Sequence, residues 1–283
     1  MANERTVLIT GATGKQGGAT ARALAGKGFT LRAMTRTPDS DAAKAVASAT
    51  GAELVRGDLN DAASLKHALT GAWGVFAVQN TWEAGVAGEE EQGKRIATAA
   101  RDAGVQHFVY TSVGSAHRKT GIPHFDNKYR VEDTIRGLDF PSHVILRPVF
   151  FMENLTSAWF LNGDTLHAAM PPALKLQMIA TTDIGRHAAR AFTDAETLNR
   201  REIDLAGDAV TMPEVAAALS KGLGRTISFM QIPMSDVRKN SEDFALMLEW
   251  FERVGYDADI AGLERESGIR PTKLVEWAAT LAG

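Results

Sequence analysis

The chain of 283 residues contains no cysteine. This absence excludes disulfide bonds, thiolate nucleophiles, iron–sulfur clusters and cysteine-rich zinc sites, and we predict no metal site. No apolar run approaches the ~20 residues that a membrane-spanning helix needs, so we expect no transmembrane segment. Residues 1–5 lead straight into a short apolar strand, so we also expect no signal peptide. These absences fit a protein of the reducing cytoplasm.

A large excess of charge is absent as well. The chain has 31 Lys and Arg against 34 Asp and Glu, a formal net charge of −3. Direct nucleic-acid binding is disfavoured, because neutralising phosphates needs a clustered basic surface. Since 45% of the residues are hydrophobic, the chain can bury an ordinary core. Its length predicts one large domain, or one domain with an appendage.

Short apolar segments alternate with helical segments in the first half. We predict strands at 6–10, 30–35, 53–56, 74–78, 107–111 and 142–146, and helices at 16–27, 39–50, 61–69, 89–103 and 125–136. Strands without polar alternation, separated by helices, are typical of a parallel sheet covered on both faces. Right-handed crossovers then predict an α/β fold with a doubly wound, Rossmann-type sheet.

This rhythm breaks after about Pro148, and residues 151–283 predict a smaller mixed α/β lobe over the mouth of the sheet. Some of its segments could return to the sheet of residues 1–150. We expect a helix at 183–192 capped by Asp183, and a helix near 213 whose capping box joins Thr211 to Glu214. Further expected elements are strands at 202–206 and 226–233 and helices near 235–254 and 272–281.

A glycine-rich loop separates the first strand from the first helix. Gly11, Gly14 and Gly17 are spaced G-x-x-G-x-x-G, and Thr13, Lys15 and Gln16 lie between them. Glycines let a backbone turn sharply and approach a pyrophosphate, and a helix N-terminus offers free N–H groups. The alternative is an ordinary glycine-rich turn. The position at the first strand–helix junction favours a dinucleotide-binding loop.

The end of the second strand distinguishes NADP from NAD. An NAD site needs an acid there for the ribose 2′-hydroxyl, but this sequence has Arg36. A guanidinium suits a 2′-phosphate, and Lys15 adds a second cation, so we predict that NADPH is preferred over NADH. Alternatively both are solvated surface charges, and Asp39 could compete for Arg36. Asp58, after the third strand, is a candidate for binding adenine or equally a turn residue.

The helix after the fifth strand contains a candidate catalytic pair. His124 and Lys128 are one helical turn apart, and His124 occupies the position of Tyr in a Tyr-x-x-x-Lys pair. A neighbouring ammonium disfavours the protonated imidazole, so we expect His124 to be a poor acid. Lys128 could bind the nicotinamide ribose, and the Ser112 hydroxyl could orient a carbonyl. Alternatively, His124 is only a helix-entry residue, Lys128 is a surface charge, and the Ser112 hydroxyl bonds the backbone at the strand end.

Several segments occur in an order and spacing that resemble the NmrA-like proteins, atypical members of the short-chain dehydrogenase/reductase superfamily. These segments are 10–18 (TGATGKQGG), Arg36, 57–58 (GD), 81–83 (TWE), 109–114 (VYTSVG), 124–128 (HFDNK), 147–154 (RPVFFMEN) and 183–185 (DIG). The resemblance implies an NADP(H)-binding Rossmann domain at 1–150 and a smaller lobe at 151–283 over the cofactor cleft.

The resemblance also implies roles for particular residues. It places Gly11 through Gln16 at the phosphates, Arg36 at the 2′-phosphate and Lys128 at the ribose. It implies that one strand-end segment passes near the ribose and nicotinamide, namely Gln79, Asn80 and Thr81. It implies that a second segment lines the nicotinamide, namely Phe151, Met152, Glu153 and Asn154.

Members of this family act either as redox sensors that bind a regulatory protein or as reductases of quinones and related molecules. His in place of Tyr is typical of the sensors. We therefore predict a redox-sensing regulator that responds to its nicotinamide cofactor, with an NADPH-dependent reductase of quinones or similar apolar substrates as the alternative. The expected partners are the dinucleotide and a regulatory protein, and the expected assembly is a monomer or homodimer.

Overall fold

The computed structural model describes residues 5–282. Seven parallel strands form one sheet in the order β11-β6-β5-β4-β1-β2-β3. They are β1 (Arg5–Ile9), β2 (Phe29–Thr35), β3 (Glu53–Arg56), β4 (Gly74–Ala77), β5 (His107–Thr111), β6 (Ser142–Pro148) and β11 (Glu202–Leu205). The predicted Rossmann-type α/β fold is confirmed.

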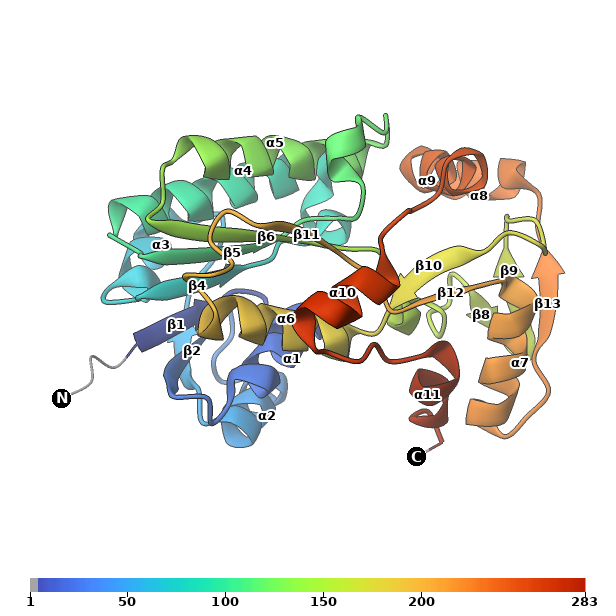
Figure 1. Cartoon of the computed structure of the whole chain (residues 1–283), viewed down its shortest axis with the longest axis horizontal. Helices are drawn as coiled ribbons and strands as arrows, with labels where there is room; N and C mark the ends of the chain where they lie inside the picture. The colour runs from blue at the N-terminus through green and yellow to red at the C-terminus, as the bar shows by residue number, and fades with distance from the viewer. Residues whose placement is uncertain (1–4, 283) are drawn as a thin grey trace.

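Helices cover both faces of this sheet (Figure 1). One face carries α3 (Ala62–Leu69), α4 (Thr81–Asp102) and α5 (Pro123–Gly137); the other carries α1 (Lys15–Leu24), α2 (Asp41–Thr50) and α6 (Thr181–Thr193). All residues of β4 and β5 are buried. Burial on both faces explains why these strands are continuous apolar runs without polar alternation.

Two three-stranded sheets lie at the other end of the molecule (Figure 1). One contains β12 (Asp208–Val210), β10 (Leu176–Ile179) and β7 (Phe150–Phe151), and the other contains β13 (Ser228–Gln231), β9 (Thr165–Ala168) and β8 (Leu161–Asn162). The remaining helices are α7 (Met212–Leu223), α8 (Met234–Asn240), α9 (Glu242–Arg253), α10 (Ile260–Ser267), α11 (Leu274–Ala279) and two 3₁₀ turns, η1 (Ala116–Arg118) and η2 (Met152–Asn154). Within residues 5–282, no helix is long and apolar enough to cross a membrane.

Segments of the second half return to the large sheet. β11 pairs with β6 in parallel, with Glu202 opposite Ile145. α6 packs against α1 so closely that a side chain on Gly185 would place its Cβ 2.5 Å from the carbonyl oxygen of Ala19. The strand order and this contact follow from a chain that leaves the sheet after β6 and comes back at β11.

Asp183 does not cap α6, contrary to the sequence-based expectation. The N-cap position is Ala180, and Asp183 lies in the first turn with its side chain buried. Its Oδ2 accepts a hydrogen bond from the backbone N–H of Thr272 at 2.7 Å, and its Oδ1 accepts one from the Thr272 hydroxyl at 3.0 Å. Asp183 therefore ties the C-terminal segment to α6. The capping box of Thr211 and Glu214 is present as predicted.

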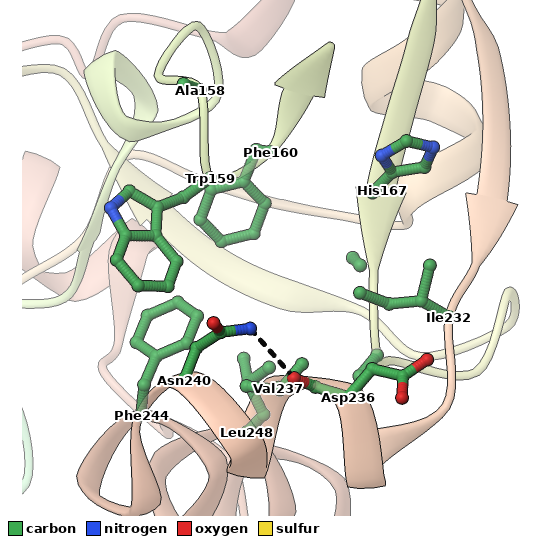
Figure 2. A pocket seen from close by; sticks show the side chains of 12 residues that line it. Ala158, Trp159, Phe160, His167, Ile232, Asp236, Val237, Asn240, Phe244 and Leu248 are labelled. Carbon is green, nitrogen blue, oxygen red and sulfur yellow. Dashed lines mark hydrogen bonds between the residues drawn. The ribbon is translucent and has the colours of Figure 1, made fainter.

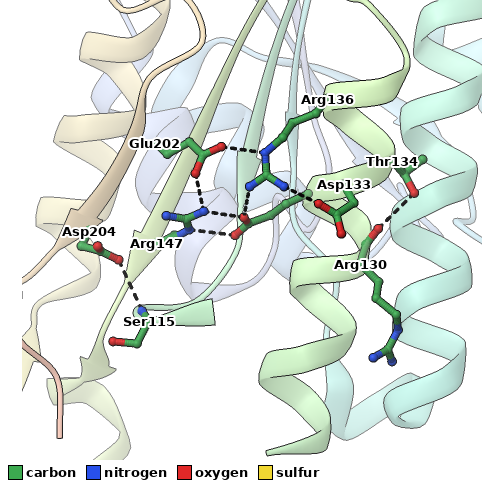
Figure 3. A network of polar contacts seen from close by, with 9 residues as sticks. Ser115, Arg130, Asp133, Thr134, Arg136, Arg147, Glu202 and Asp204 are labelled. Carbon is green, nitrogen blue, oxygen red and sulfur yellow. Dashed lines mark hydrogen bonds and ion pairs between the residues drawn. The ribbon is translucent and has the colours of Figure 1, made fainter. Parts of the chain in front are cut away.

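A network of charged side chains holds β6, α5 and β11 together (Figure 3). Arg147 of β6 donates from Nε to Oε1 of Glu132 at 2.9 Å and from Nη2 to Oε2 of Glu202 at 2.5 Å. Arg136 bonds the same two carboxylates, each at 2.7 Å. Arg147 and Glu132 are both buried, so each charge depends on its partners for stabilisation.

Candidate functional site

The strand order places the crevice expected of an open α/β sheet at the carboxyl ends of β1 and β4. β2 and β3 lie on one side of this pair, and β5, β6 and β11 lie on the other. The crossovers therefore leave in opposite directions from β1 and β4, which is where open α/β sheets bind ligands. The glycine-rich loop follows β1 at this point, and residues 79–81 follow β4.

The backbone of the loop requires its glycines. Gly11 has a φ of +56°, and its carbonyl accepts a hydrogen bond from the N–H of Gly14 at 2.9 Å. A Cβ on Gly17 would lie 2.3 Å from that same carbonyl oxygen. Gly14 is the N-cap of α1 and offers no side-chain acceptor, so the first N–H groups of the helix stay available to an anion.

Side chains of the loop connect it to two other predicted segments. The Nζ of Lys15 lies 3.4 Å from both the Glu153 carbonyl oxygen and the Asn154 Oδ1. Gln16 accepts a hydrogen bond from the hydroxyl of Thr111, at the end of β5, at 2.6 Å. Thr13 is exposed beside them. The loop and the segment at 153–154, far apart in sequence, are thus brought together.

Arg36 follows β2 and pairs with a carboxylate. Its Nη2 lies 2.9 Å from Oε2 of Glu83, and both side chains are largely exposed. The competing acid is Glu83, and Asp39 forms no ion pair with Arg36 among the described residues. Arg56, at the end of β3, donates to the Arg36 carbonyl oxygen at 2.9 Å. This second guanidinium was not predicted from the sequence, and the parallel pairing of β3 with β2 places it there.

Asp58 has the role of a turn residue. Its Oδ1 accepts a hydrogen bond from the backbone N–H of Asn60 at 2.8 Å, and its own N–H donates to the Ser64 hydroxyl at 3.0 Å. Binding of adenine by this carboxylate stays a prediction.

The segment after β4 begins α4 earlier than predicted. Asn80 is the N-cap, and its Oδ1 accepts from the N–H of Trp82 at 3.1 Å. Gly85 interrupts the helix with φ 71° and ψ 168°. Gln79 is buried, and neither atom of its amide has a hydrogen-bond partner within residues 5–282. Thr81 donates its hydroxyl hydrogen to Oε2 of Glu89.

Lys128 is paired with a buried acid that sequence analysis did not single out. Its Nζ lies 2.5 Å from Oε1 of Glu89, whose side chain is 1% exposed. Oε2 of Glu89 also accepts from Asn127 at 3.0 Å. Burial raises the pKa of Glu89, but the Lys128 ammonium and these hydrogen bonds outweigh it, and the pKa lies below its ordinary value. Glu89 therefore stays ionised and fixes the position of Lys128.

His124 is held by different groups. Its Nδ1 lies against Oδ2 of Asp243 from α9, and its backbone N–H donates to Oδ1 of the same carboxylate at 3.0 Å. The Trp82 ring covers it, with centroids 5.6 Å apart. His124 and Lys128 thus contact separate carboxylates. Ser112 is buried at the end of β5, and its hydroxyl has no hydrogen-bond partner in the described part of the chain.

The segment predicted to line the nicotinamide is partly structural. Met152 is fully buried in the apolar core, while Phe151 and Asn154 are half-buried. Oε1 of Glu153 accepts hydrogen bonds from the N–H and the hydroxyl of Thr181, at 2.9 and 2.8 Å. These bonds fix Asn154 beside the glycine-rich loop.

Two cavities with aromatic walls adjoin this segment. The smaller, about 170 Å³, is lined by Trp82, Asn154, Ser157, Trp159, Phe160, Ser241 and Phe244. The larger, about 370 Å³, shares Trp159, Phe160 and Phe244 and extends toward His167, Ile232 and Leu248. Figure 2 shows these aromatic rings facing the larger cavity from two sides. Asn154 places the smaller cavity next to the loop.

A sequence model described as the NmrA-like family matches residues 3–282. The chain belongs to the NmrA-like family. The predicted resemblance is confirmed, and it covers almost the whole sequence.

Curated relatives include fungal proteins of this family. The NmrA-like family domain-containing oxidoreductase notA of Aspergillus sp. (strain MF297-2) is 33% identical over 267 residues, with 83% of this chain and 77% of that protein covered. The oxidoreductase FrzB of Cladobotryum sp. is 36% identical over 159 residues, and the chain spans about half of that relative, 47%.

Solved structures share the fold. NmrA, described as a negative transcriptional regulator, in complex with NADP has a TM-score of 0.80 at 23% identity, covering 98% of this chain and 95% of that one. NmrA has also been solved with NAD, at a TM-score of 0.78 and 22% identity over the same shares of the two chains. An NADPH-dependent quinone oxidoreductase from Escherichia coli complexed with NADPH has a TM-score of 0.78 at 24% identity, covering 98% of this chain and 100% of that one.

Proposed function

We propose that this protein binds NADP(H) between the ends of β1 and β4 and reduces flat, apolar substrates such as quinones in the adjoining aromatic cavity. The position of Asn154 carries this proposal. Its side chain meets Lys15 of the glycine-rich loop and also lines the smaller cavity. A dinucleotide on the loop and an apolar molecule in the cavity would therefore be neighbours.

The donor set at the crevice suits a phosphorylated dinucleotide. The strained turn at Gly11 and the free N–H groups at the start of α1 fit a pyrophosphate. Arg36 fits a 2′-phosphate, and its backbone is braced by Arg56. Structures of relatives with bound NADP and NADPH support this assignment, and one with NAD supports the shared dinucleotide core.

Residues of this chain would hold and orient the cofactor and the substrate. The nicotinamide, when bound, supplies a hydride. Lys128, fixed by Glu89, would hold the ribose. The side-chain polar groups of Gln79 and Ser112, which have no hydrogen-bond partner within residues 5–282, are candidates for orienting polar atoms of the ligands. Trp82 and Phe244 line the cavity and would shield a bound substrate from water. Because hydride transfer to a quinone needs little proton donation at first, a tyrosine at position 124 is dispensable for it.

A second function, the redox-sensing regulator predicted from the sequence, is favoured by His124. The imidazole is buried against Asp243 and under Trp82, so the usual proton donor of this superfamily has no equivalent at this position. In this case NADP(H) binding would alter affinity for a protein partner, and no substrate would be turned over.

Calorimetric titration with NADPH and NADH, followed by NADPH oxidation across a panel of quinones and carbonyls, tests both functions. Trp159→Ala removes an exposed cavity wall, and Val275→Ala, with the same 61% exposure on α11, is the matched control. If the protein is a reductase, it should turn over quinones, and the KM for the quinone should rise in Trp159→Ala but not in Val275→Ala. Tight NADPH binding without turnover of any compound would reject the reductase and support the regulator.

A further inference from the structure

The first turn of α4 lies between the two parts of the site. Trp82 and Glu83 are consecutive in this turn, between the N-cap at Asn80 and the break at Gly85. Trp82 lines the smaller cavity, and Glu83 pairs with Arg36 at the end of β2. One short segment therefore contacts both the candidate 2′-phosphate site and the candidate substrate site.

Glu83 occupies the guanidinium that a 2′-phosphate would need. Its Oε2 lies 2.9 Å from Nη2 of Arg36, and its Oε1 accepts from the side-chain amide of Asn80 at 3.1 Å. A phosphate bound to the same guanidinium would lie close to this carboxylate, and like charges at close range repel each other. Binding of the phosphate to Arg36 would therefore weaken or displace the ion pair with Glu83.

We propose that Glu83 is a specificity-determining residue that competes with the 2′-phosphate for Arg36 and reports its arrival to Trp82. This inference rests on the proposed function, because it assumes that the dinucleotide binds at Arg36. NADP(H) would displace Glu83 from Arg36, whereas NAD(H), which lacks the phosphate, would leave the pair intact. The two cofactors would then produce different positions of Trp82 at the cavity.

The strength of the ion pair suits such an exchange. The side chains of Arg36 and Glu83 are 67% and 59% exposed, so solvent screens the pair. Exposed ion pairs are weak enough to break, contributing no more than about a five-fold factor to an equilibrium. A phosphate carries more charge and offers more acceptor oxygens than a carboxylate, so it wins the exchange.

The backbone allows the displacement to reach Trp82. Gly85 has a non-helical conformation that separates residues 81–84 from the rest of α4, and a Cβ there would meet nothing within 4 Å. Trp82 is 64% exposed and lies over His124, so solvent surrounds much of its ring. Residues 82–84 can therefore shift while Thr81 keeps its hydrogen bond to Glu89, which forms the buried ion pair with Lys128.

Binding of 2′,5′-ADP and 5′-AMP tests the proposal, because these probes differ only by the 2′-phosphate and lack the nicotinamide. Glu83→Gln should bind 2′,5′-ADP about two- to five-fold more tightly than the wild type, with 5′-AMP unchanged. Glu91→Gln, which removes an exposed carboxylate farther along α4, is the control for net charge and should change neither affinity. Equal affinities of the wild type and Glu83→Gln for 2′,5′-ADP would overturn the competition.

Tryptophan fluorescence tests the signal to Trp82. In the wild type 2′,5′-ADP should shift the emission, 5′-AMP should not, and Trp82→Phe should abolish the difference. A difference that persists in Trp82→Phe would overturn this step. If the wild type binds neither probe nor NADPH, the proposed function itself fails, whereas binding without an effect of Glu83→Gln rejects the role of Glu83 alone.

Discussion

Glu89 and Lys128 form a buried ion pair across α4 and α5, with 2.5 Å between Oε1 and Nζ. The two residues are 39 positions apart, and the carboxylate also bonds Thr81 and Asn127. Three donors around one carboxylate leave it little freedom, so it fixes the ammonium at one place on α5. The candidate ribose-binding lysine is thereby positioned by a residue outside the crevice.

We predict that Glu89→Gln lowers both stability and NADPH affinity. Removing one partner of a buried pair costs about 3–5 kcal/mol, because the remaining charge is desolvated without compensation. Chemical denaturation and calorimetric NADPH titration measure the two effects. Glu91→Gln, on the exposed face of the same helix, should leave both unchanged. Wild-type affinity in Glu89→Gln would show that Lys128 needs no positioning.

The same pair predicts a dependence on acid. The pKa of Glu89 in the folded protein lies below its ordinary value of 4.5, so its contribution to stability is fully present above that pH. It is lost as the pH falls below 4.5 through the folded pKa, where the carboxylate takes up a proton. The free energy of unfolding, measured between pH 6 and 3, should therefore fall less steeply below pH 4.5 in Glu89→Gln than in the wild type.

Arg36→Ala should separate the two cofactors. Hydrogen bonds to charged groups contribute about 1.5–3 kcal/mol, so NADPH affinity should fall about 10- to 100-fold while NADH affinity changes little. Arg265→Ala, an exposed arginine on α10, is the control. A comparable loss of affinity for NADH and NADPH would refute the assignment of Arg36 to the 2′-phosphate.

Strands buried on both faces were predictable from the sequence, and short paired strands were not. β5 occupies the residues expected for it and β4 ends one residue earlier than expected, because apolar runs between helices have few other solutions. β7 and β8 have two residues each. β7 pairs with β10, which is distant in the sequence, and β8 pairs with β9 across a short turn. Nothing in so short a run distinguishes a strand from a loop.

The residues of the candidate site likewise include some that could be proposed from the sequence and some that could not. The glycine-rich loop and Arg36 could be proposed from the sequence because their positions relative to strands suggest their chemistry. Glu89 lies in the charged run Glu89-Glu-Glu91, which reads as a solvated helix face, and only the packing of α4 on α5 buries its first member. The sequence does contain a signal for the early start of α4, because Asn80 is a good N-cap residue.

The buried His107 predicts a second loss of stability at mildly acidic pH. Burial lowers the pKa of His107 to about 4, below its ordinary value of 6.5, and the neighbouring His143 and Arg5 add to the shift. The unfolded chain therefore binds a proton first, and stability falls as the pH drops from 6.5 to 4, by up to about 3 kcal/mol. His107→Asn can keep the bond to the Ser142 hydroxyl, and it should reduce this slope in denaturation at several pH values.

Two comparisons make the histidine prediction specific. Burial also lowers the pKa of His187 to about 4, so part of the slope should survive in His107→Asn. His67→Asn, on an exposed position of α3, should leave the slope unchanged. An unchanged slope in His107→Asn would show that His107 does not titrate between these limits.

The network around Arg147 predicts a difference between breaking and replacing a buried ion pair. Arg147→Met leaves Glu132 buried with only Arg136 as a partner, and we expect a loss of about 3–5 kcal/mol and a melting temperature at least about 6 °C lower. The double variant Arg147→Met/Glu132→Met buries two apolar side chains and leaves Arg136 with Glu202, so it should recover part of that loss.

Arg225→Met, which breaks an exposed pair with Asp164, is the control and should change stability by less than about 1 kcal/mol. If the double variant melts no higher than Arg147→Met alone, the loss of a partner of the buried Glu132 carboxylate is not what destabilises the single variant.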